Sequence, residues 1–433
     1  GVAADADRIP TLGVEGGVVP PFALLAMDDA PARNRVRAER FAREMFPRHA
    51  APAPPPAARP QRLKLGYFSA DFHDHATMYL MARLFELHDC DRFELHAFSY
   101  GPDRQDAMRV RARAAFHQFH DVRTRSDQAI AAAARAAGID IAINLKGYTE
   151  GGRPEIFAQR AAPVQISFLG YPGTMGAPFI DYLVADPTLI PPAQRAHYSE
   201  SIIALPHTYQ VNDNTRAIAS RTPPREELGL PADSFVFCSF NNTYKITRAE
   251  FDIWMQLLRQ VDGSVLWLLQ SNTDAAANLK REASARGVEP ARLVFAPPAP
   301  HGEHLARCRA ADLFLDTFAC NAHTTASDAL WAGLPIVTLP GDGLIARVAA
   351  SVLNAIDLPE LVTHSRQDYA ALALDLATNP ARLAEIRRKL DAHRLTTPLF
   401  DTARFARHIE AAYDAAYQRY LDGKPPGDIA IPA

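Results

Sequence analysis

The sequence has no run of about 20 apolar residues, the length that a helix needs to cross a membrane. Among its 433 residues only four are cysteines, and none forms a CxxC pair. This argues against a disulfide framework or a structural zinc site and fits a reducing compartment. A net charge of −3 gives no electrostatic reason to bind nucleic acid or an anionic membrane. We therefore expect a soluble, cytoplasmic protein without a nucleic-acid or membrane partner.

Two common nucleotide-binding signatures are missing as well. The loops "KGYTEGGRPE" and "GYPGTMGAP" are rich in glycine, which allows a backbone to approach a ligand closely. Neither loop matches GxGxxG or GxxxxGK[ST]. Their absence counts against a nicotinamide enzyme and against a P-loop enzyme.

What the sequence does contain is a regular alternation of strand and helix patterns. Residues 1–60 are predicted to form an N-terminal helical segment followed by a proline-rich linker. Two Rossmann-like lobes are predicted to follow, over residues 61–225 and 226–400, and residues 401–433 to form a helix that packs back, with a tail. The predicted fold class is α/β, with two doubly wound parallel sheets that face a cleft. Ligands in such sheets lie beyond the carboxyl ends of the strands.

The stretch "NAHTTASDALWAG" is the strongest candidate for a binding site. His323, Thr324 and Thr325 stand where a strand gives way to a predicted helix. The N-terminus of a helix attracts phosphate, and threonine hydroxyls can add hydrogen bonds to it. Asp328 lies one turn further on, where it could accept hydrogen bonds from a ribose. The alternative is an ordinary helix cap, a common role of threonine.

Two further junctions of the second lobe carry polar residues. Lys245, after the first strand, could neutralise a departing diphosphate, although a solvated surface lysine is the alternative. His301 and His304 in "APHGEH" could contact a nucleobase. Surface histidines are the alternative, and a zinc pair has weak support at this spacing.

In the first lobe, "DFHDHAT" follows the first strand. Its two histidines and two aspartates, Asp71, His73, Asp74 and His75, could hold a metal ion or transfer a proton. A hydrogen-bonded surface loop is the alternative. Asp140 begins a strand, is therefore expected far from the carboxyl ends, and is a weak candidate.

Taken together, these motifs resemble the catalytic region of the O-linked N-acetylglucosamine transferases, family 41 of the glycosyltransferases. The resemblance runs from about residue 62 to 425 and rests on "DFHDHAT", "FNNTYK", "APHGEHLAR" and "CNAHTTASDALWAGLPIVTLPG". It implies the two-lobed GT-B fold. It also implies transfer of N-acetylglucosamine, with inversion, from UDP-N-acetylglucosamine to serine or threonine hydroxyls of a protein, without metal or other cofactor.

The resemblance assigns roles to individual residues. His75 matches the proposed catalytic base, and Lys245 would contact the diphosphate with the two threonines. His304 would stack on uracil, and the loop 299–301 would bind the edge of the base. The implied nucleotide-sugar-binding residues are Asn242, Lys245, Ala299, Pro300, His301, His304, Arg307, His323, Thr324, Thr325 and Asp328.

The sequence departs from the family pattern at four of these motif positions. Asn242 stands where animal members have glutamine, and His301 where they have lysine. His73 replaces a glycine and Ala76 a proline beside the proposed base. The tetratricopeptide superhelix that selects protein substrates in the family is missing, and residues 1–50 are expected to be its remnant.

Two alternative functions remain open. A SPINDLY-like protein O-fucosyltransferase would use GDP-fucose on the same fold, and that branch tends to lack the histidine of the HTT stretch, here His323. A catalytically silent binding scaffold is the other alternative. The joint presence of His75, Lys245, Asp328 and both threonines argues against it.

Overall fold

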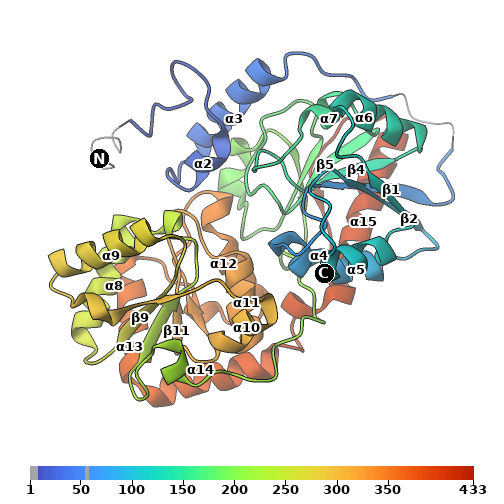
Figure 1. The fold of residues 1–433 in the computed structure, drawn as a ribbon. Helices are drawn as coiled ribbons and strands as arrows, with labels where there is room; N and C mark the ends of the chain where they lie inside the picture. The colour runs from blue at the N-terminus through green and yellow to red at the C-terminus, as the bar shows by residue number, and fades with distance from the viewer. Residues whose placement is uncertain (1–7, 54–57) are drawn as a thin grey trace. The chain divides into compact units, whose positions relative to one another are not determined.

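The computed structural model describes residues 8–53 and 58–433 and shows an α/β protein with two parallel sheets (Figure 1). The chain forms two compact units. Unit 1 contains the described residues up to Asn214 together with Asp342–Leu344 and Asp401–Ala433, and unit 2 contains Thr215–Gly341 and Ile345–Phe400. Residues 54–57 of the predicted linker lie outside the described part of the chain. The predicted α/β class with two parallel sheets is confirmed.

The sheet of unit 1 has eight described strands, all paired in parallel, in the order β13-β7-β6-β5-β4-β1-β2-β3. Its strands are β1 (Leu63–Ser69), β2 (Phe93–Ser99), β3 (Gln118–Asp121), β4 (Ile141–Asn144), β5 (Val164–Ser167), β6 (Tyr182–Ala185), β7 (Ser201–Ala204) and β13 (Ile429–Ala430). Its helices are α2 (Pro21–Leu25), α3 (Pro31–Met45), α4 (Ala76–Leu87), α5 (Ala107–Ala115), α6 (Asp127–Ala136), α7 (Glu155–Ala158), η1 (Pro192–His197) and α15 (Thr402–Leu421).

The sheet of unit 2 has five described strands, also parallel, in the order β10-β9-β8-β11-β12. These are β8 (Val236–Ser239), β9 (Val265–Leu269), β10 (Leu293–Ala296), β11 (Leu313–Leu315) and β12 (Ile336–Val337). The helices are α8 (Arg248–Gln260), α9 (Thr273–Ala285), α10 (His301–Cys308), α11 (Thr324–Ala332), α12 (Val348–Ala355), α13 (Arg366–Thr378) and α14 (Pro380–His393). Short 3-10 turns complete it: η2 (Arg225–Leu228), η3 (Thr243–Lys245), η4 (Pro290–Arg292), η6 (Pro359–Leu361) and η7 (Pro398–Phe400), while η5 (Leu344–Ala346) spans the junction of the two units.

The order of the strands creates a switch point in unit 2. From β8 the chain winds outward through β9 to β10, and then returns to place β11 on the other side of β8. The loops that leave the carboxyl ends of β8 and β11 therefore diverge, and such a divergence opens a crevice suited to a ligand.

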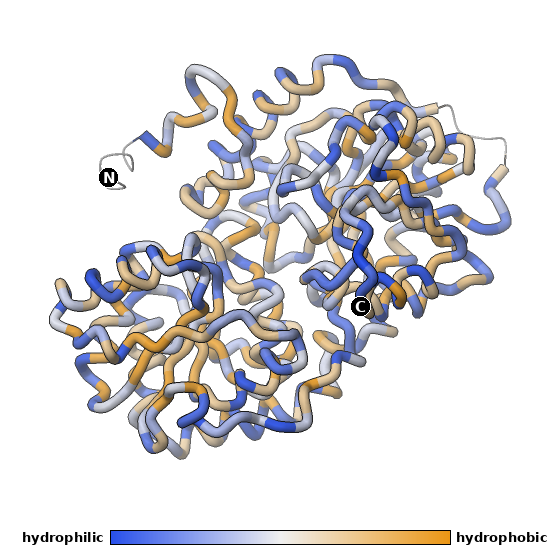
Figure 2. The backbone as a smooth tube through the Cα atoms, in the orientation of Figure 1, coloured by the Kyte–Doolittle hydropathy of each residue, from blue (hydrophilic) through white to orange (hydrophobic). Residues whose placement is uncertain are grey.

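The core strands are apolar because helices cover both faces of a parallel sheet. Every residue of β4, β5 and β8 is buried, and the hydrophobic colouring follows the strands (Figure 2). One of the glycine-rich loops serves this packing. A Cβ atom at Gly170 would lie 1.8 Å from the carbonyl oxygen of Leu145, so only glycine fits there.

The division of the chain lies earlier than the predicted boundary at residues 225 and 226. The cause is that the segment after Asn214 already packs on unit 2. The Ala219 amide donates to the Gly302 carbonyl oxygen at 3.0 Å, and Arg216 forms a buried ion pair with Asp328. Residues 401–433, predicted as a helix that packs back, with a tail, belong to unit 1.

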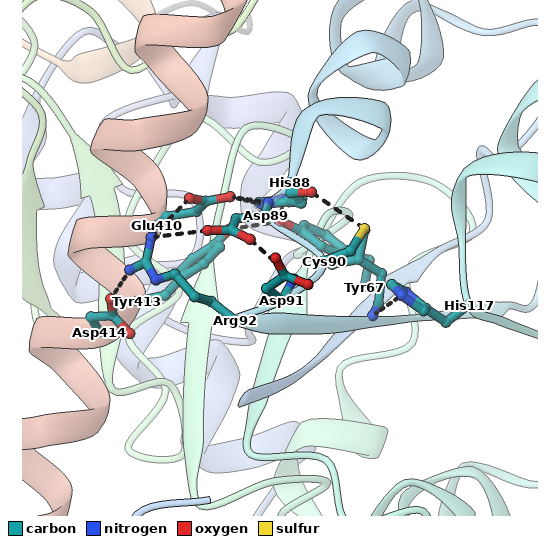
Figure 3. A network of polar contacts seen from close by, with 11 residues as sticks. Tyr67, His88, Asp89, Cys90, Asp91, Arg92, His117, Glu410, Tyr413 and Asp414 are labelled. Atoms are coloured by element: carbon teal, nitrogen blue, oxygen red, sulfur yellow. Dashed lines mark hydrogen bonds and ion pairs between the residues drawn. The ribbon is translucent and has the colours of Figure 1, made fainter. Parts of the chain in front are cut away.

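A buried polar network fixes α15 to the sheet of unit 1 (Figure 3). Glu410 of α15 accepts hydrogen bonds from the Asp89 amide at 2.9 Å and from His88, whose Nδ1 lies 3.0 Å away. The other ring nitrogen of His88 lies 2.8 Å from the hydroxyl of Tyr67 on β1, which is 3.1 Å from that of Tyr413. The network therefore connects the C-terminal helix to β1, an inner strand of the sheet.

We predict that Glu410→Ala destabilises α15 and β1 by about 3 kcal/mol, because it leaves His88 and the Asp89 amide buried without their acceptor. Asp414→Ala on the same helix removes more exposed contacts with Arg59 and Arg92 and should cost less than about 1 kcal/mol. Hydrogen exchange of the two elements measures both effects. Equal protection in the two variants would contradict the prediction.

Candidate functional site

The predicted binding residues of unit 2 meet at its switch point. Lys245 ends η3 in the loop after β8, and its Nζ donates to the Asn321 carbonyl oxygen, in the loop after β11, at 2.8 Å. The Thr325 hydroxyl at the start of α11 donates to Oδ1 of Asn241 at 2.7 Å. The structure thus joins the lysine motif and the threonine motif, which lie far apart in the sequence.

The centre of this junction is Asp316, which sequence reasoning did not single out. Its fully buried carboxylate accepts hydrogen bonds from the Thr317 amide (2.8 Å), the Ala322 amide (2.6 Å), the Asn241 side chain (3.2 Å) and the Thr338 hydroxyl (2.7 Å). Burial raises the pKa of Asp316 to about 6, against the effect of these donors. The sequence feature that could have identified Asp316 is its position directly after the apolar strand "LFL".

The Thr325 hydroxyl has a partner within the protein, the side-chain oxygen of Asn241. Asn241 uses its amide hydrogens toward Asp316 and Thr317, so its oxygen is the atom that faces Thr325. The Thr325 hydroxyl proton therefore points to Asn241 and not toward a phosphate. In this structure Thr325 can serve a ligand through its backbone amide, and Thr324 is the residue whose hydroxyl remains for that purpose.

His323 occupies the N-cap position of α11. Its Nε2 lies 2.9 Å from the Ile345 carbonyl oxygen and therefore carries a proton. Burial, together with nearby Lys245, lowers the pKa of His323 to about 3. The ring is neutral at pH 7, with its position fixed by the backbone.

His304 presents a second neutral ring at this edge of the sheet. It packs edge-on against Phe240, with ring centroids 5.2 Å apart, and its Nδ1 accepts a hydrogen bond from Arg307 at 3.1 Å. Burial is the main reason that its pKa falls to about 3. Arg307 also donates to the Pro297 carbonyl oxygen at 2.5 Å, so it holds His304 and the loop before α10 in place.

Asp328 is buried beside a cation that the sequence did not reveal. Arg216 donates to its carboxylate at 2.6 Å, and Nε2 of His301 lies 3.9 Å from the same oxygen. Burial nevertheless raises the pKa of Asp328 to about 6. Arg216 in turn lies over the Trp331 ring, 5.6 Å from its centroid.

The remaining predicted residues of unit 2 border this cluster less directly. Asn242 is exposed and caps η3, accepting from the Tyr244 amide at 3.5 Å. Pro300 precedes α10, and its carbonyl oxygen accepts from the His304 amide at 2.9 Å. Ala299 stands just before it and is partly exposed.

In unit 1, the loops after β1 and β4 bring Asp71 and Lys146 together. The two strands are parallel neighbours, so their carboxyl ends share one edge of the sheet. Nζ of Lys146 lies 2.9 and 3.2 Å from the two carboxylate oxygens of Asp71, and both side chains are 9% exposed. Lys146 was not among the predicted site residues.

His75 is the N-cap of α4, which follows this loop. Its Nδ1 accepts a hydrogen bond from the Thr77 amide at 3.2 Å and also lies 3.2 Å from the Thr77 hydroxyl and 3.5 Å from Asp71 Oδ2. The side chain is 41% exposed. Desolvation lowers its pKa, Asp71 opposes this, and Lys146 adds to it. The ring is therefore neutral at pH 7.

Other candidates of unit 1 have structural roles. Asp140 accepts from the Lys64 amide and the Tyr417 hydroxyl, both at 2.8 Å. Asp74 accepts from the Met108 amide at 3.3 Å, and His73 is buried beside it. Within residues 8–53 and 58–433, no group of three or more His, Cys, Asp or Glu side chains is placed to hold a metal ion, and no helix is long and apolar enough to cross a membrane.

The model of glycosyl transferase family 41 matches residues 54–222 and 220–409. The chain belongs to glycosyl transferase family 41. This family assignment agrees with the sequence resemblance, and the fold is GT-B, as expected.

Individual relatives support this assignment. A probable UDP-N-acetylglucosamine–peptide N-acetylglucosaminyltransferase of Arabidopsis thaliana, SEC, is 38% identical over 86% of this chain and 39% of its own length. The corresponding transferase of Caenorhabditis elegans is 29% identical over 84% of this chain and 41% of its own. A solved structure of a Thermobaculum terrenum O-GlcNAc transferase variant superposes with a TM-score of 0.84 at 29% identity, covering 97% of this chain and 78% of that one. The chain thus spans about two fifths of the curated relatives.

We predict that the pH dependence of unit 2 stability reports the Asp316 carboxyl. Its pKa is raised from 3.8 to about 6 by folding, so the native state binds the proton more tightly. The resulting stabilisation is fully present below pH 3.8 and is lost as the pH rises through about 6. Relative to Asp316→Asn, the wild type should gain up to about 3 kcal/mol between pH 7.5 and pH 4.

Urea unfolding followed by tryptophan fluorescence measures this difference, because all three tryptophans lie in unit 2. His304 and His323 have the opposite effect, since their lowered pKa values cost stability below pH 6.5. They are present in both proteins and cancel in the comparison. A difference that stays constant with pH would contradict the prediction.

Proposed function

We propose that the protein transfers N-acetylglucosamine from UDP-N-acetylglucosamine to serine or threonine hydroxyls of a protein acceptor. The observation that carries this proposal is the placement of Lys245 at the switch point of unit 2, joined through Asn321 to the loop that leads into α11. Family membership and the activities named for the relatives support it.

The diphosphate of the donor fits the start of α11. The N-terminus of a helix has a partial positive charge and directs backbone N–H groups outward. The Lys245 ammonium adds a full charge, and the Thr324 hydroxyl a donor. These groups can stabilise the negative charge that develops on the departing UDP, the task that a divalent metal performs in other enzymes. We therefore expect no metal cofactor.

The nucleoside fits the polar groups around α10. His304 offers a neutral ring for stacking on uracil, and residues 299–301 lie beside it to bind the edge of the base. Asp328 is assigned to the ribose hydroxyls. A buried carboxylate with a raised pKa accepts such hydrogen bonds at pH 7 because Arg216 keeps it charged.

The transfer itself requires one bond to form and one to break. The acceptor oxygen attacks the anomeric carbon, and the bond from that carbon to the diphosphate oxygen breaks with inversion. Its electron pair leaves with UDP, and the hydroxyl proton passes to a base. We assign this role to His75, which needs a neutral ring. The unprotonated nitrogen of that ring in this structure is Nδ1, which accepts the Thr77 amide hydrogen.

Two other functions stay as alternatives. A protein O-fucosyltransferase would take GDP-fucose at the same helix end, and the presence of His323 argues for N-acetylglucosamine instead. A silent scaffold has no need to keep Lys245, Thr324 and Asp328 gathered around one crevice. The cellular setting that we propose is the cytoplasm.

We predict that Lys245→Met lowers turnover of UDP-N-acetylglucosamine by about 100- to 1000-fold, since the leaving diphosphate loses a half-buried cationic partner. Lys280→Met, at an exposed lysine of α9 in the same unit, is the matched control and should have full activity. The assay follows UDP release and the mass of a serine/threonine peptide library, with GDP-fucose in parallel. Substantial turnover by Lys245→Met would contradict the mechanism, and transfer from GDP-fucose alone would select the fucosyltransferase.

A further inference from the structure

We propose that Lys146 is a positioning residue that keeps His75 neutral by competing with it for the carboxylate of Asp71. The inference deepens the proposed function, on which the role of His75 in transfer rests. Its basis is a chain of contacts at the carboxyl edge of the unit 1 sheet, from the loop after β4 to the N-cap of α4.

The contacts show which partner Asp71 favours. Lys146 reaches both carboxylate oxygens, at 2.9 and 3.2 Å, whereas Nδ1 of His75 lies 3.5 Å from Oδ2 alone. The Thr77 hydroxyl donates to the same Oδ2 at 3.4 Å. Since Lys146 and Asp71 are both nearly buried, each depends on the other for charge compensation. The carboxylate is thereby turned toward Lys146, with His75 at its edge.

Four charged or titratable groups of the surrounding elements act electrostatically on His75. Asp71 and His73 come from the loop after β1, Arg104 from the loop after β2, and Lys146 from the loop after β4. Asp71 is the sole anion of this set. Without Lys146 its charge would be available to a protonated His75, and the two would form a carboxylate–imidazolium pair.

Such a pair would change the chemistry of the loop. A protonated ring has no free nitrogen and cannot accept the acceptor proton. It also cannot accept the Thr77 amide hydrogen, the contact that caps α4. Holding Asp71 on Lys146 thus protects both the proposed base and the start of the helix.

The loop that carries Lys146 does not depend on the charge of its side chain. The backbone of this residue already fixes the loop, because its amide donates to Asn144 Oδ1 at 3.0 Å and its carbonyl oxygen accepts from the Thr149 amide at 3.1 Å and hydroxyl at 2.7 Å. These contacts persist when the side chain is replaced. A change of charge at Lys146 can therefore be tested with the loop in place.

The test is the titration of His75 followed by 15N NMR of its ring nitrogens, with the signal assigned by its loss in His75→Gln. In Lys146→Met the pKa of His75 should rise by on the order of one unit, and in Lys146→Arg, which retains the charge, it should stay near the wild-type value. In Lys146→Met with Asp71→Asn the rise should disappear. Lys146→Gln serves as a second neutral variant if the methionine variant fails to fold. An unchanged titration in the folded neutral variants, or equal shifts in the arginine and methionine variants, would overturn the inference.

Turnover gives a second, separate readout. The acid limb of the pH–rate profile should move up with the pKa of His75 in Lys146→Met, with UDP affinity of unit 2 unchanged. A shifted NMR titration in a protein that shows no transfer at all would refute the proposed function and leave the inference on Lys146 standing. A normal transfer profile with an unshifted titration would support the proposed function and refute the inference on Lys146.

Discussion

The carboxylate of Asp316 connects three neighbouring strands of unit 2. It lies directly after β11, accepts from Asn241 after β8 and accepts from Thr338 after β12. Through Asn241 it orients Thr325, and through the Ala322 amide it shapes the loop whose carbonyl oxygen holds Lys245. The groups assigned to the diphosphate are arranged around this hydrogen-bonded centre.

Burial sets the charges of both units by the same physical effect. In unit 2 it keeps His304 and His323 neutral and raises the pKa of Asp316 and Asp328. Arg216 opposes the effect of burial on the pKa of Asp328 but does not outweigh it. Lys245 places a cation beside the loop that leads into the N-terminus of α11, an environment suited to an anionic ligand. In unit 1 we propose that Lys146 binds the Asp71 carboxylate and thereby keeps His75 neutral.

The sequence was sufficient for the fold class and for the motifs at the strand ends. Alternating apolar strands and helices predicted the two sheets, and the HTT and lysine motifs fell at the switch point because parallel strands bring their carboxyl ends to one edge. It did not reveal Arg216, which is 112 residues from Asp328, or Lys146, which is 75 residues from Asp71. Each is an isolated basic residue whose partner depends on tertiary packing. The partner of the Thr325 hydroxyl could not be predicted either, because Asn241 follows a different strand.

The measurement that tests the central claim most directly is thermal unfolding of the whole chain with UDP, with GDP and without nucleotide, in EDTA. Tryptophan fluorescence reports unit 2 selectively, because Trp254, Trp267 and Trp331 all lie there. A nucleotide at 100 times its dissociation constant stabilises a protein by about 2.7 kcal/mol, a clearly visible shift. The account predicts that shift with UDP and little with GDP, in the absence of free divalent metal. No shift with UDP, or a shift with GDP alone, would contradict it.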